Sequence, residues 1–66
     1  MSIAKVIEIS ASSAESFEDA IRQGIKRAAE TIENIQAAWI KELKTLVEKG
    51  KVVEFRVIMK ITFVLH

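Results

Sequence analysis

The chain has 66 residues, half of them apolar, with ten lysines and arginines against nine acidic residues. This length allows a single domain over residues 1–66, and the apolar half excludes a disordered tail or a linker. A net charge of +1 argues against nucleic-acid binding. The absence of cysteine excludes disulfides and thiolate metal sites. Because so short a chain buries only about 60% of its unfolded surface, we expect it to gain stability by associating with other copies.

The sequence also argues against membrane insertion, secretion and catalysis. No uncharged run is long enough to span a bilayer, and the first residues lack the basic start and long apolar region of a signal peptide. We therefore expect a cytoplasmic protein. His66 is the only histidine, and the chain has neither a nucleophile–base set nor a glycine-rich phosphate loop. These features favour a binding or structural protein over an enzyme.

The first half of the chain predicts a strand followed by a helix. Residues 3–10 are rich in β-branched side chains, which favours a strand. In the serine-rich run that follows, Ser12 and Glu15 have the spacing of a capping box, and Ser13 is a nearly equal N-cap candidate. Asn34 is the expected helix stop. Apolar residues between these limits recur at steps of three and four, which indicates one buried stripe. The stripe consists of Phe17, Ala20, Ile21, Gly24, Ile25, Ala28 and Ile32.

Gly24 stands in the middle of the apolar stripe. Inside a helix, glycine costs about 1 kcal/mol relative to alanine. The residue is therefore either a tolerated imperfection or the mark of a close approach between helix and sheet, and we expect the close approach.

The second half of the chain predicts a β-hairpin. Residues 35–48 and 51–65 have the composition of strands, and Lys49-Gly50 between them forms a two-residue turn in which glycine supplies a positive φ. Such a turn places Glu48 opposite Lys51 and thereby sets the register of the whole hairpin. The pairs expected further along are Val47–Val52, Leu43–Arg56, Lys41–Ile58 and Trp39–Lys60.

Alternation along residues 51–65 gives the predicted sheet two different faces. The face expected to cover the helix carries Val53, Phe55, Val57, Met59, Ile61, Phe63 and Leu65. The opposite face carries Val52, Glu54, Arg56, Ile58, Lys60, Thr62 and Val64, with Leu43 and Trp39 across from them.

No second helix within the chain covers this opposite face, which is half apolar. We expect its apolar patch to be an association site. The patch consists of Trp39, Leu43, Val47, Val52 and Ile58. A β-bulge within 41–46 would turn Glu42 and Lys44 away from the helix side and would change the pairings beyond it, including that of Trp39.

Four segments taken together resemble the dodecin family. They are "KVIEI", "SSAESFEDAI", "TIENI" and "GKVVEFRVIMKITFVL", and the similarity runs from Lys5 to Leu65 in the same order and with close spacing. The resemblance implies an α+β fold of the order β-α-β-β, in which a three-stranded antiparallel sheet wraps around one helix. It also implies a hollow homododecamer of cubic symmetry that stores or scavenges flavin (riboflavin, FMN or FAD) without catalysis. In the family, flavins stack in pairs across two-fold axes, each ring against a tryptophan.

The resemblance implies a flavin site formed by four residues of the predicted sheet. The tryptophan of flavin-binding members falls on Ala37 in an ungapped alignment, and Trp39 lies where those members have a carboxylate. Two residues along a strand keep the same face, with a displacement of about 6–7 Å. The flavin-bonding glutamine of the family's "YQ" pair corresponds to Arg56, whose guanidinium donates hydrogen bonds but cannot accept them. Arg56 and Lys60 are expected to meet the polar ring edge or the phosphate.

Two alternatives to a flavin site remain open. In the first, Trp39 anchors a subunit interface, with Lys60 over its ring as a cation–π pair. In the second, a dodecin-like shell binds a nucleotide phosphate or coenzyme A through Arg56, Lys41 or Lys60, or a hard cation, or no ligand. The candidate cation ligands, at symmetry-related positions of the shell, are Glu8, Glu42, Glu48 and Glu54.

Overall fold

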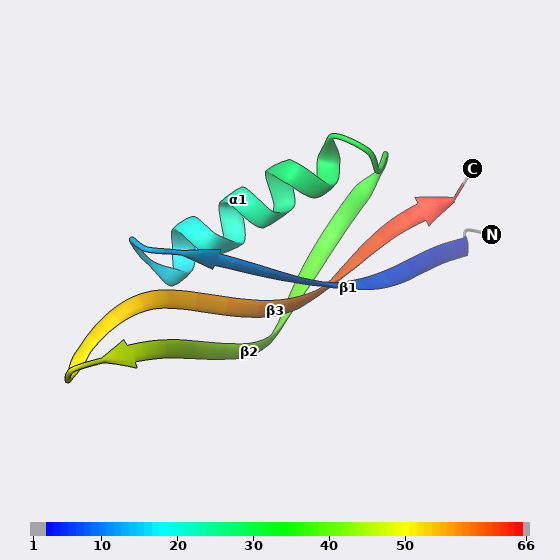
Figure 1. Ribbon diagram of the computed structural model, residues 1–66. Coiled ribbons are helices and arrows are strands. Elements are labelled where there is room, and N and C mark those ends of the chain that lie inside the picture. The colour runs from blue at the N-terminus through cyan, green and yellow to red at the C-terminus, as the bar shows by residue number, and fades with distance from the viewer. Residues whose placement is uncertain (1–2, 66) are drawn as a thin grey trace.

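The computed structural model describes residues 3–65, which form three strands and one helix in the order β-α-β-β (Figure 1). The elements are β1 (Ile3–Ser13), α1 (Phe17–Ala29), β2 (Ile35–Glu48) and β3 (Lys51–Leu65). β3 is the central strand and is antiparallel to both β1 and β2. The predicted α+β class, with one three-stranded antiparallel sheet and one helix, is confirmed. His66 lies outside the described residues.

Helix α1 lies against one side of the curved sheet and leaves the other side uncovered (Figure 1). β1 begins and β3 ends at the same end of the molecule, and the turn between β2 and β3 projects at the opposite end, beyond the helix. The resulting shape is elongated, with extents of 52 × 19 × 13 Å. A large part of the sheet therefore has no covering layer within the described chain.

The hydrophobic core lies between α1 and the facing side of β3. Phe17 of the helix also packs edge-to-face on Phe55, with ring centroids 5.1 Å apart. The predicted helix-facing run of β3 is thus confirmed from Phe55 to Ile61. The core is small, because few of the described side chains lose all contact with solvent. The completely buried ones are Ala20, Val57, Met59 and Ile61.

Gly24 marks a close approach of the helix to the sheet, as expected. A Cβ atom at this position would lie 2.5 Å from Met59 Cε and 2.9 Å from Ala11 Cβ. Carbon atoms in favourable contact are about 3.5–4.0 Å apart. The missing side chain therefore lets α1 pack directly on β1 and β3.

The helix begins later than predicted. Ser16 is the N-cap, and its Oγ accepts a hydrogen bond from the Asp19 N–H at 2.9 Å. The predicted cap at Ser12 or Ser13 is wrong because β1 continues to Ser13, three residues beyond the predicted strand end. Ser13 Oγ instead accepts from the Glu15 N–H at 2.9 Å and donates to the Asp19 carboxylate at 2.6 Å.

The helix also ends earlier than predicted. It stops at Ala29 rather than continuing through Ile32. The Glu30 N–H bonds to the Arg27 carbonyl, which is the tight geometry common at helix ends. Asn34 has a positive φ of 62° and lies directly before β2. Asn34 is therefore a turn residue ahead of the strand, and the helix has already ended before it.

The predicted two-residue turn of the hairpin is confirmed. Lys49 and Gly50 have φ angles of 52° and 76°, and positive values at both positions are the mark of a type I′ turn. Glu48 lies opposite Lys51. The predicted pairing next to the turn is therefore confirmed.

Three β-bulges interrupt the pairing of β2 with β3. The extra residues are Val53 on β3, and Lys41 and Gln36 on β2. Counted from the turn, the bulge at Val53 shifts the register by one residue. The bulge at Lys41 restores the register because it lies on the opposite strand. Trp39 therefore lies opposite Lys60, as predicted.

Between the first two bulges the predicted register is wrong by one residue. The expected pairs Leu43–Arg56 and Lys41–Ile58 do not form. By alternation Leu43 lies on the helix-side face, and so does the pair Val47–Val52 near the turn, so the predicted apolar patch on the uncovered side keeps only Trp39 and Ile58. Val53 leaves the predicted helix-facing run and is 41% exposed. The observed pairs are Leu43–Val57, Lys44–Arg56 and Glu42–Ile58.

Candidate functional site

The sheet face that points away from α1, called the outer face below, carries the predicted site residues. Residues opposite one another in neighbouring strands share a face, and every second residue returns to it. This alternation builds the outer face from rows of one residue per strand. Three successive rows are Glu8–Lys60–Trp39, Ser10–Ile58–Glu42 and Ser12–Arg56–Lys44.

Trp39 is 62% exposed on this face. The ammonium of Lys60, its cross-strand neighbour, lies over the indole with Nζ 5.5 Å from the ring centroid. This distance is within the range of a cation–π contact. The described residues therefore leave most of the indole uncovered, and the ring is available to a ligand or to another subunit.

The bulge at Lys41 adds an ion pair beside the tryptophan. Lys41 Nζ lies 3.1 Å from Glu8 Oε1, so its side chain reaches across β3 to β1. Glu8 is the cross-strand neighbour of Lys60 on β1. Among residues 3–65, Lys60 makes no ion pair of its own.

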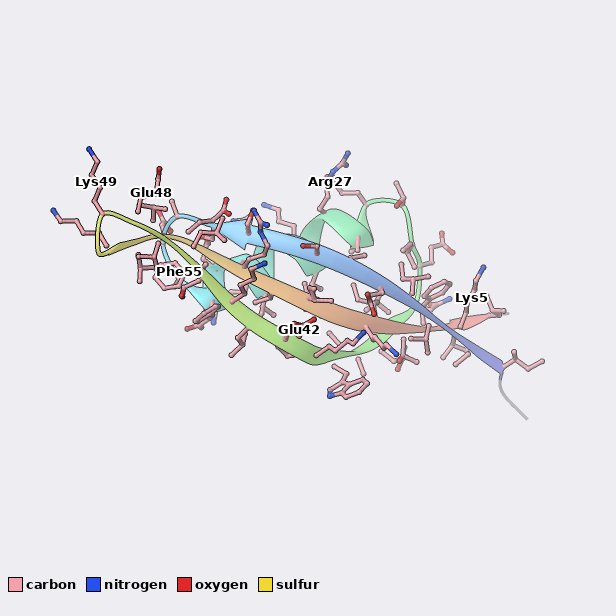
Figure 2. All side chains as sticks on the ribbon, turned by 60° about the horizontal axis from the view of Figure 1, so that its bottom comes forward. Lys5, Arg27, Glu42, Glu48, Lys49 and Phe55 are labelled. Carbon is pink, nitrogen blue, oxygen red and sulfur yellow. The ribbon has the colours of Figure 1, made fainter. Side chains whose placement is uncertain are left out.

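A polar hollow of about 310 Å³ lies one row away from the tryptophan. Glu42, one of its lining residues, lies in the middle of β2, far from Glu48 and Lys49 at the turn (Figure 2). The hollow combines hydroxyl, carboxylate and cationic groups around one aliphatic side chain. It is lined by Ser10, Glu42, Lys44, Arg56 and Ile58.

Arg56 lies on the outer face but not beside Trp39. It lies four positions from Lys60 on β3, which corresponds to about 13 Å along the strand. Its guanidinium donates to Glu54 Oε2 at 2.7 Å. Ala37, opposite Thr62, occupies the next row on the other side of Trp39. Within one chain the structure therefore brings Trp39 and Lys60 into contact, sets Ala37 beside them, and keeps Arg56 apart.

Ser10 and Lys44 of the hollow were not predicted as site residues, and Glu42 was predicted only as a candidate cation ligand. Glu42 and Lys44 reach the outer face only because the bulge at Lys41 turns over the residues of β2 that follow it. The disturbed alternation of charges over 41–46 was the sequence signal for this change. Ser10 was missed because the predicted first strand ended there.

The candidate cation ligands do not gather in one chain. Glu8 is paired with Lys41 and Glu54 with Arg56. Figure 2 shows Glu42 and Glu48 far apart along β2. Within residues 3–65 there is no group of three acidic, histidine or cysteine side chains close enough to share a metal ion.

Sequence comparison decides the family. The dodecin family model matches residues 3–66. The chain belongs to the dodecin family. Among dodecins of known structure, the one from Streptomyces davaonensis is 31% identical, with a TM-score of 0.92 over 98% of this chain and 96% of that chain. A search of curated protein sequences gives no match.

Two further dodecin-like structures share the fold. The tt0972 protein from Thermus thermophilus is 26% identical, with a TM-score of 0.94 over 100% of this chain and 97% of that chain. The calcium dodecin of Mycobacterium tuberculosis, described as calcium-chelating, is 28% identical, with a TM-score of 0.84 over 97% of this chain and 91% of that chain.

In the part of the chain that the structure describes, no helix has the length and apolar character needed to cross a membrane.

Proposed function

We propose that this dodecin binds a flavin without covalent attachment and stores or sequesters it, with no catalytic step. The observation that carries the proposal is Trp39, an indole 62% exposed on the uncovered outer face and next to a polar hollow. An exposed aromatic ring of this size offers a stacking surface to a flat ring system, worth about 0.5–1.5 kcal/mol beyond the burial of area.

Each of the four candidate residues has a role in this proposal. Trp39 stacks on the isoalloxazine ring. Arg56 donates hydrogen bonds to ring carbonyls or to a phosphate, and Lys60 donates to the phosphate of FMN or FAD, since neither side chain can accept one. Ala37, whose methyl side chain lies one row from the indole, leaves room above the sheet for the ring.

The proposal includes assembly into a homo-oligomer, with the dodecamer of the family as the expected size. Two features support it. The described residues bury few side chains completely, and large apolar side chains remain exposed. A mostly apolar hollow of about 570 Å³ lies between α1 and the edge strand β1, with Ile7, Ile9 and Ile32 among its lining residues. A chain with so small a core is stabilised when other copies cover such surfaces.

The test is a titration of riboflavin, followed by quenching of flavin fluorescence and by the absorption spectrum. Trp39→Ala is expected to weaken binding by about ten-fold or more. Leu43→Ala is the matched control, because Leu43 is similarly exposed on β2 but lies on the helix-side face. Sedimentation of each variant confirms that assembly is intact.

The outcomes separate the roles of the tryptophan. Equal affinity of the wild type and Trp39→Ala would remove Trp39 from the site. Absence of any flavin binding by the wild type would refute the function, and loss of assembly in Trp39→Ala would then assign the residue to an interface.

A second candidate function is a dodecin shell that binds a different ligand. It is favoured by Arg56, which replaces a glutamine of flavin-binding members and is already bonded to Glu54, and by Ala37 at their tryptophan position. The ligands to test are calcium and coenzyme A, by isothermal titration calorimetry. Binding of either one, together with no response to riboflavin, would favour this candidate.

A further inference from the structure

We infer that Lys60 is a specificity-determining residue of the flavin site: in the free protein its ammonium occupies one face of Trp39, and a flavin ring that stacks on this face must displace it. The inference rests on the proposed flavin function and adds to it a built-in competitor. The competitor lowers the affinity for an uncharged ring.

The contact between the two side chains is direct. Lys60 Nζ lies 5.5 Å from the centroid of the indole, and the two residues are opposite each other on β3 and β2. A stacked ring needs van der Waals contact with the same face of the indole. The ammonium and the ring therefore cannot occupy that face together.

The ion pair between Lys41 and Glu8 explains why Lys60 stays on the indole. Glu8 lies opposite Lys60 on β1 and would be its natural partner. The bulge turns Lys41 to the outer face, where its ammonium lies 3.1 Å from the Glu8 carboxylate. With Glu8 occupied and no other described carboxylate in ion-pair range, the ring face of Trp39 is the remaining attractive position for the Lys60 charge.

The strength of the competition follows from the exposure of the pair. A cation–π contact at an exposed site corresponds to a factor of about two to five in an equilibrium constant. Removing the ammonium while keeping the length of the side chain is expected to strengthen the binding of riboflavin, which carries no phosphate, by this factor.

The first experiment measures riboflavin affinity of the assembled protein. Lys60→Met is expected to lower the dissociation constant about two- to five-fold, and Lys60→Arg, which retains a cation over the ring, is expected to bind like the wild type. Lys26→Met is the control, since it removes one positive charge from an exposed position on α1. Assembly of each variant is checked by sedimentation.

The second experiment tests the link through Glu8. Lys41→Met frees Glu8, which then attracts Lys60 away from the indole, so this variant is also expected to bind riboflavin more tightly. In a Glu8→Gln background, Lys41→Met is expected to change nothing. The emission of Trp39, the only tryptophan, reports the position of the ammonium without any ligand and should change in Lys60→Met and Lys41→Met alike.

The outcomes distinguish the inference from the function on which it rests. Tighter binding in both methionine variants, with the Lys41 effect lost in Glu8→Gln, supports the competition. Riboflavin binding that is unchanged or weaker in Lys60→Met overturns the inference and leaves the flavin function standing, because the ring then uses the other face of the indole. Absence of riboflavin binding in the wild type and in Lys60→Met refutes the function and the inference together.

Discussion

Replacing Gly24 by leucine is expected to destabilise the protein by overpacking the contact between α1 and the sheet. The first atom of any side chain at this position would already lie 2.9 Å from Ala11 Cβ and 2.5 Å from Met59 Cε. Ala11 Cβ is fixed to the backbone of β1, and Met59 is completely buried. Ala11 can therefore yield only if β1 shifts, whereas Met59 Cε is the end of a flexible side chain and yields more readily.

The magnitude is the difference between two opposing terms. Overpacking in a core costs about 1–3 kcal/mol, and replacing a helical glycine regains about 0.8–1.0 kcal/mol. Gly24→Ala is therefore expected to lie between about zero and 2 kcal/mol of net destabilisation. Gly24→Leu, with three more atoms in the same space, should lose at least about 1 kcal/mol, which lowers the melting temperature by about 4–8 °C in a chain of this size.

The assay is thermal unfolding at one fixed protein concentration, because association makes the melting temperature depend on concentration. A double-mutant cycle with Ala11→Gly isolates the predicted clash, since that change removes the closest fixed atom. Gly24→Ala is expected to be less harmful in the Ala11→Gly background. An unchanged melting temperature of Gly24→Leu, or a cycle with no coupling, would show that α1 does not pack at this distance.

Three further predictions concern the helix cap, the turn and assembly. Ser16→Ala is expected to lower the free energy of unfolding by about 0.5–2 kcal/mol, because the Ser16 Oγ accepts a hydrogen bond from the Asp19 N–H. Ser12→Ala, at an exposed position of β1, is the control and should alter thermal unfolding little. Equal losses in the two variants would contradict the cap. Lys49→Asn is expected to stabilise by about 0.5–1 kcal/mol, because φ is 52° there and asparagine tolerates the left-handed region better than lysine; a lower urea midpoint would count against it. Sedimentation at micromolar concentration should show a large oligomer, and a stable monomer would end the association argument.

The order of elements and both ends of the hairpin register could be predicted from the sequence. The strict alternation of β3 and the glycine in a two-residue turn determine them, and both are local signals. The bulge near Lys41 was also signalled, because charged residues there broke the alternation. The bulge at Val53 gave no such signal, because Val52 and Val53 are chemically identical and either suits a strand.

The start of the helix could not be predicted for a different reason. The serine-rich run contains several possible caps, and the capping-box spacing of Ser12 with Glu15 is a local preference. Pairing with β3 overrides it, since Ser12 and Ser13 lie opposite Arg56 and Phe55 in the sheet. The same long-range pairing brings Ser10 to the polar hollow, which is why the sequence alone did not place it in the site.

The bulges at Lys41 and Val53 lie on opposite strands, so the pairing is offset by one residue between them and returns beyond Lys41 to the register that the turn sets. Each bulge turns over the residues of its own strand between itself and the turn, so residues 42–48 of β2 and 51–52 of β3 have the opposite faces from those that strict alternation from Trp39 and Lys60 gives. Deleting an extra residue would remove its bulge and leave the remaining pairs in place, so a deletion at Lys41 or Val53 should be better tolerated than a deletion of a paired residue between them. A relative that lacks one of these bulges would be one residue shorter there, and an ungapped alignment across that position would compare side chains from opposite faces of the sheet.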